Sequence, residues 1–92
     1  MEADRTERLR ARLQAELDPT LLEISDDSHL HAGHADAASG GSHYSVKIAS
    51  EKFAGLTLVM RHRLVYDAVH EMINKAEIHA LAITAIAPTE SD

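Results

Sequence analysis

The sequence predicts a single small α/β domain, of the α+β type, in which helices cover a three-stranded mixed sheet. Two kinds of periodicity support this fold class: apolar residues recur every three or four positions in some segments and alternate with polar residues in others. These segments follow the order α-β-β-α-α-β. A chain of 92 residues has room for one hydrophobic core. We therefore assign residues 1–92 to one domain, with a flexible loop at about 27–42 and a polar tail at 88–92.

The first predicted element is a helix over residues 4–17. Asp4 can cap its N-terminus, and Glu7, three residues further on, is placed to complete a capping box. Three leucines form its apolar stripe: Leu9, Leu13 and Leu17. Asp18-Pro19 ends the helix, because a proline disfavours the helical conformation of the residue before it.

Two strands are predicted next, over residues 20–25 and 43–50. Leu22 and Ile24 share one face of the first strand. Alternation in the second strand is clear, with three apolar residues on one face: Tyr44, Val46 and Ile48. The stretch between the strands is rich in Gly, Ser, Ala, Asp and His. A loop this long in so small a domain is often functional or disordered, and we expect residues 28–42 to be mobile without a partner.

The second half of the chain predicts two helices and a strand. Phe53 and Gly55 mark a turn into a helical region at 57–75, in which we expect a short helix followed by a longer one from near Leu64. Its apolar stripe is Leu58, Val65, Val69, Met72 and Ala76. The last strand covers residues 77–87, with apolar residues on both faces, so we expect it to be central or well covered.

The connections predict the sheet topology. A hairpin can join the first two strands, which makes them antiparallel, whereas the last strand is reached through helices, which favours a parallel pairing. The helices would then cover one face of the sheet.

Composition and charge restrict the function. The formal net charge is −6, so the chain gains no long-range attraction to nucleic acid or to anionic membranes. It contains no cysteine, which excludes disulfides and thiolate metal sites of its own. There is no apolar run of about 18 residues and no signal-like apolar stretch near Met1. We expect a cytoplasmic protein without membrane contact, monomeric or weakly dimeric.

Histidine is the residue type that suggests chemistry. The chain has seven histidines, and four of them lie in or beside the long loop: His29, His31, His34 and His43. Imidazole binds borderline metals well. From the residues alone, metal binding and a set of exposed polar side chains without a ligand remain equally open. His79, between Ile78 and Ala80, is by itself more typical of a structural residue at a strand start.

Several motifs resemble the BolA family, in order and at the right spacing. They are Phe53-Ala-Gly55, Arg61-His62-Arg63-Leu64-Val65-Tyr66 and Ile78-His79-Ala80-Leu81-Ala82-Ile83, with Asp26-Asp27-Ser28 and His43-Tyr44 in support. The resemblance covers roughly residues 5–90. It implies a fold like that of class II KH domains. It also implies a monothiol glutaredoxin as partner, with which a [2Fe–2S] cluster is shared, or a role in transcriptional regulation.

The resemblance also assigns cluster ligands. It implies that His79 is the shared ligand, and that the second ligand is a loop histidine, either His31 or His34, because this loop carries extra residues that leave the alignment open. Histidine nitrogens can replace two thiolates on one iron of such a cluster. A cysteine-free chain would need thiolates from the glutaredoxin and its glutathione, so no cofactor is expected in the isolated chain.

Two alternatives stay open. The first is a DNA-binding transcriptional regulator that uses a basic cluster formed by Arg61, His62 and Arg63, with Lys75. The same residues could equally be the solvent-exposed start of a helix without a binding role. The loop could instead form an independent His-rich metal-binding module. KH-type RNA binding is disfavoured because no glycines are spaced as GxxG. An enzyme is not expected, because the chain has no cysteine nucleophile and no GxSxG motif.

Overall fold

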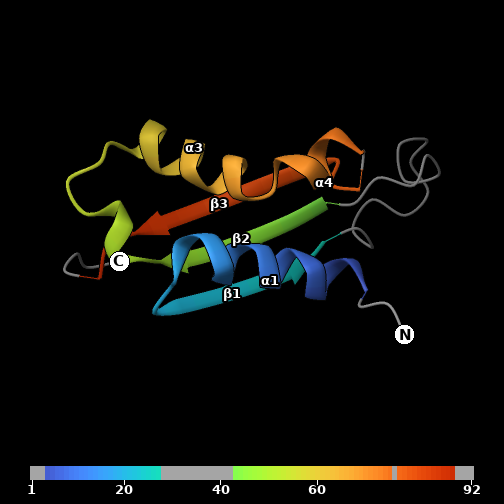
Figure 1. The fold of residues 1–92 in the computed structure, drawn as a ribbon, viewed down its shortest axis with the longest axis horizontal. Coiled ribbons are helices and arrows are strands. Elements are labelled where there is room, and N and C mark those ends of the chain that lie inside the picture. Colours follow the sequence, from blue (N-terminus) through green and yellow to red (C-terminus); the bar gives the residue numbers. More distant parts are fainter. Residues whose placement is uncertain (1–3, 28–42, 76, 89–92) are drawn as a thin grey trace.

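The computed structural model describes residues 4–27, 43–75 and 77–88 (Figure 1). The predicted α-β-β-α-α-β order is confirmed, with one short 3₁₀ helix added. The elements are α1 (Arg5–Leu17), β1 (Leu21–Asp26), β2 (His43–Ala49), η2 (Glu51–Phe53), α3 (Leu58–Ala68), α4 (His70–Asn74) and β3 (Ala80–Ile86). The predicted mobility of residues 28–42 concerns a segment outside the described residues. Among the described helices, none is long and apolar enough to cross a membrane.

The sheet has the predicted mixed topology, in the order β1-β2-β3. β1 and β2 are antiparallel, with Ile24 opposite Val46, and β2 and β3 are parallel, with Val46 opposite Ile83. Helices α1, α3 and α4 lie on one face of this sheet (Figure 1). The expectation that β3 is central or well covered was wrong: β2 is central, and β3 is an edge strand with one face exposed. The apolar residues on its second face, Ala80 and Ala82, are small and exposed.

Leucines of α1 anchor the core between the helices and the sheet. The side chain of Asp4 accepts a hydrogen bond from the backbone N–H of Glu7, at 2.9 Å, as the capping pattern predicts. The predicted stripe of α1 is fully buried, and it packs with Tyr44, Val46, Ile48, Phe53 and Val65. The core is therefore mostly aliphatic, as expected from an aromatic content of 3%.

The two helices of the second half are divided differently from the prediction. The first, α3, is the longer one, and the break falls at Val69 rather than before Leu64. Thr57 caps α3 by accepting a hydrogen bond from the backbone N–H of Met60, so the helix is already formed in the basic cluster. Leu58, predicted in the apolar stripe, is 65% exposed instead. Arg61 occupies the inward position of this turn.

Ser50 connects the sheet to α1 and is expected to contribute to stability. It is fully buried, and its hydroxyl donates a 2.6 Å hydrogen bond to the backbone carbonyl of Leu17. Ser50→Ala leaves that buried carbonyl without its donor, which we expect to lower the free energy of unfolding by about 1–2 kcal/mol. Urea denaturation of this variant and of the exposed control Thr84→Ala measures the difference. An equally small loss in both variants would contradict the assignment.

Candidate functional site

The candidate site lies at the end of the sheet where β3 begins. β3 starts at Ala80 rather than at residue 77, because the backbone N–H groups of Glu77 and Ile78 donate to the carbonyl of Met72 and form a turn. Ile78 is buried, and it fixes this turn to the core. His79 therefore precedes the strand and is exposed, as its proposed role requires.

His43 is the residue that the structure brings to His79. It opens β2, and because β2 and β3 are parallel, their first residues meet at one edge of the sheet, with His43 opposite Ala80. The two imidazole rings are stacked, with centroids 5.4 Å apart and an angle of 16° between their planes. The sequence groups His43 with the loop but not with the site. The parallel pairing that it predicted was the signal that could have placed His43 beside His79.

Asp27 lies at this end of the sheet, next to His43. Its backbone N–H donates a 2.7 Å hydrogen bond to the carbonyl of His43. Its carboxylate accepts hydrogen bonds from the hydroxyls of Ser25, at 2.7 Å, and Ser45. A hollow of about 320 Å³ opens here, lined by Asp27, His43, Tyr44, Ser45, Ala80, Leu81 and Ala82. The small side chains of β3 leave this space open.

The predicted loop ligands His31 and His34 lie outside the described residues. Their segment is joined to the described chain at Asp27 and His43, which are hydrogen-bonded neighbours at the His79 end of the sheet. Within residues 4–27, 43–75 and 77–88, no group of three or more histidine, cysteine or acidic side chains is placed to hold a metal ion.

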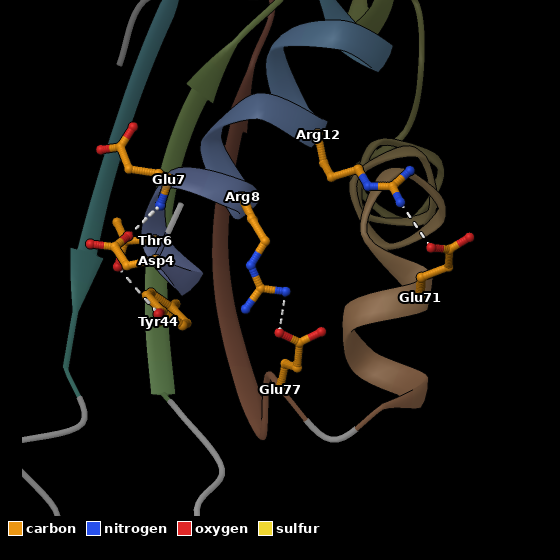
Figure 2. A network of polar contacts seen from close by, with 8 residues as sticks. All are labelled: Asp4, Thr6, Glu7, Arg8, Arg12, Tyr44, Glu71 and Glu77. Carbon is orange, nitrogen blue, oxygen red and sulfur yellow. Dashed lines mark hydrogen bonds and ion pairs between the residues drawn. The ribbon is translucent and has the colours of Figure 1, made fainter. Parts of the chain in front are cut away.

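Two ion pairs tie α1 to the chain that leads into His79 (Figure 2). Arg8 pairs with Glu77, two residues before His79, and Arg12 pairs with Glu71 of α4 at 2.8 Å. Side chains of both arginines are about half exposed, so each pair is worth little in stability. The pair of Arg8 and Glu77 places α1 beside the turn at 77–79.

The basic cluster does not form one exposed patch. Arg61 is 6% exposed; its Nε donates to the carbonyl of Leu56 at 3.0 Å, and its Nη1 donates to the carbonyl of Ala85 at 3.2 Å. His62 is half-buried, whereas Arg63 is exposed. Arg61, which the sequence groups with His62 and Arg63 in one basic cluster, is instead buried and joins the start of α3 to β3. Of the cluster, Arg63 offers exposed positive charge, as does Lys75 directly after α4.

Comparison with known proteins points to one family. Residues 13–90 match the family of BolA-like proteins. The chain is 44% identical to the chloroplastic protein BOLA1 of Arabidopsis thaliana, over 96% of this chain and 56% of that protein. It is 43% identical to SufE-like protein 1 of the same plant, over 90% of this chain and 24% of that protein. The chain thus spans less than two thirds of either relative.

Solved structures agree with the sequence relatives. The BolA domain of SufE1 from Arabidopsis thaliana superposes with a TM-score of 0.84 at 41% identity, covering 99% of this chain and all of that one. The mouse BolA1 structure superposes with a TM-score of 0.73 at 38% identity, covering 94% of this chain and 68% of that one. These similarities extend over the whole sheet and its helices.

Proposed function

Since the chain belongs to the BolA family, we propose that it acts as a binding adaptor rather than as an enzyme. Its proposed partner is a monothiol glutaredoxin, with which it shares a [2Fe–2S] cluster through histidine ligands. The role is cluster assembly and trafficking or iron regulation. The observation that carries the proposal is the exposed His79 at the sheet end where both ends of segment 28–42 are anchored.

The donor set fits a shared cluster better than one held by this chain alone. The chain has no cysteine, and its described part holds no metal-ligand group of three or more side chains. Imidazole nitrogens can replace two thiolates on one iron, which raises the reduction potential of the cluster. The remaining thiolates would come from the glutaredoxin and its glutathione.

This chain's own part in the proposal is to present imidazoles at a fixed place. His79 follows a turn whose backbone is bonded to Met72 and whose Ile78 is buried in the core. The pair of Arg8 and Glu77 further restrains that turn. We propose one of His31 and His34 as the second ligand. A ligand on a short, anchored turn keeps its position when the partner docks.

Single replacements should identify the loop ligand. We expect either His31→Ala or His34→Ala to remove the spectrum of mixed histidine and thiolate ligation from the glutaredoxin complex, because a lost imidazole leaves one iron with an incomplete ligand set. The other single variant should keep that spectrum. Visible circular dichroism of each reconstituted complex measures the result. If both single variants and the double variant keep the wild-type spectrum, the loop does not supply the ligand.

A further inference from the structure

We propose that His43 and His79 form a two-imidazole site for one divalent first-row transition-metal ion, such as Zn²⁺, in the chain without any partner. This site shares His79 with the proposed cluster but requires neither glutaredoxin nor loop histidines. Either proposal can therefore fail while the other holds.

The first support is the backbone that carries the two rings. His43 opens the central strand β2, and His79 directly precedes Ala80, the residue paired with His43 in the parallel ladder. Both positions are fixed by the sheet and by the turn on Met72. The backbone that carries the two rings is therefore held in place before an ion binds.

The second support is the distance between the rings. Metal–nitrogen bonds of about 2.0–2.1 Å, plus about 1.1 Å from nitrogen to ring centre, put two imidazole centroids about 5 Å apart on a tetrahedral ion. The observed separation of His43 and His79 is 5.4 Å. The ring planes are nearly parallel, so one ring must turn before both nitrogens point at one ion. That rotation, about the bond from Cβ to the ring, has a broad and shallow profile.

The third support is the surrounding charge and space. Asp27 and His43 line the same hollow of about 320 Å³, which Ala80 borders directly after His79, and the negative charge of Asp27 favours a cation bound at His43. Ala80 and Ala82 leave room for the water molecules that would fill the other positions of the ion. Zn²⁺, Ni²⁺ and Cu²⁺ all accept imidazole, so the site selects by donor type rather than for one metal.

The test must first remove the competing loop histidines. We would use the full chain with His29→Ala, His31→Ala and His34→Ala together, and titrate it with Zn²⁺ by isothermal calorimetry. One ion per chain is expected. Adding His43→Ala or His79→Ala should weaken binding by about tenfold or more, because each removes one of the two protein ligands. His70→Ala, an exposed histidine on α4, is the matched control and should leave the affinity unchanged within about twofold.

The variant His43→Phe, made in the same background, separates metal ligation from ring stacking. His43→Phe keeps an aromatic ring against His79 but has no nitrogen, so we expect it to bind Zn²⁺ as weakly as His43→Ala. Circular dichroism in the far ultraviolet checks that every variant is folded. The proposal is overturned if the loop variant binds no Zn²⁺, if His43→Ala and His79→Ala bind like the control, or if His43→Phe restores the affinity.

Discussion

Replacing Arg61 by alanine is expected to lower the free energy of unfolding by about 2–4 kcal/mol. The guanidinium is 6% exposed and donates to the carbonyls of Leu56 and Ala85, which join the start of α3 to β3. Hydrogen bonds from a charged group are worth about 1.5–3 kcal/mol, and removing the donor leaves buried carbonyls unsatisfied. Urea denaturation measures the loss.

Two further variants sharpen that result. Arg63→Ala removes an exposed arginine from the same helix and should change stability by no more than about 0.5 kcal/mol. Arg61→Lys keeps the charge but lacks the planar fork that reaches two separate carbonyls, so it should recover only part of the lost stability. If Arg61→Ala and Arg63→Ala were equally mild, the structural role of Arg61 would be refuted.

His79→Ala is expected to abolish the mixed-ligand spectrum of the glutaredoxin complex while the domain stays folded. His79 is exposed and precedes β3, so its removal costs little packing, within about 0.5 kcal/mol. The strand itself is held by its pairing with β2 and by Ala85 in the core. Visible absorption and circular dichroism of the complex report the ligand change, and thermal denaturation reports the fold.

The control for this prediction is His70→Ala. His70 is exposed on α4, and a ring nitrogen lies 3.1 Å from the carbonyl of Asp67. His70→Ala removes one histidine, as His79→Ala does, but it leaves the histidines at the end of the sheet unchanged. If His70→Ala altered the spectrum as strongly as His79→Ala, the effect would not come from ligation at the proposed position.

Local periodicity predicted most of the fold. The stripe of α1, the alternation in β2 and the capping by Asp4 are properties of short segments, and all three are confirmed. The division of the second helical region was wrong because it depends on a tertiary contact. A sequence-based interpretation leaves an arginine in solvent, whereas Arg61 finds two carbonyl acceptors only once β3 lies beside α3.

The candidate site was predictable only in part. His79 came from the resemblance to the BolA family, and the structure places it in solvent at the sheet end, where such a ligand must lie. The partner ring of His43 depends on the register of β2 against β3, across 36 residues of chain. The alternation of each strand fixes which face a residue occupies, but it leaves shifts of two residues between the strands open. The strand order of the sheet likewise depends on tertiary structure. Small apolar residues on both faces of β3 suggested a central strand, but Ala80 and Ala82 are exposed on the face that no helix covers.

The proposed function requires this chain to supply histidine ligands to a cluster that a monothiol glutaredoxin also holds. The most direct measurement is co-purification of the two proteins under anaerobic conditions, followed by visible circular dichroism of the complex. We expect a one-to-one complex whose spectrum differs from that of the glutaredoxin-bound cluster alone, and that loses this difference with His79→Ala. A complex whose spectrum equals that of the glutaredoxin alone, with wild-type chain and variant alike, would contradict it.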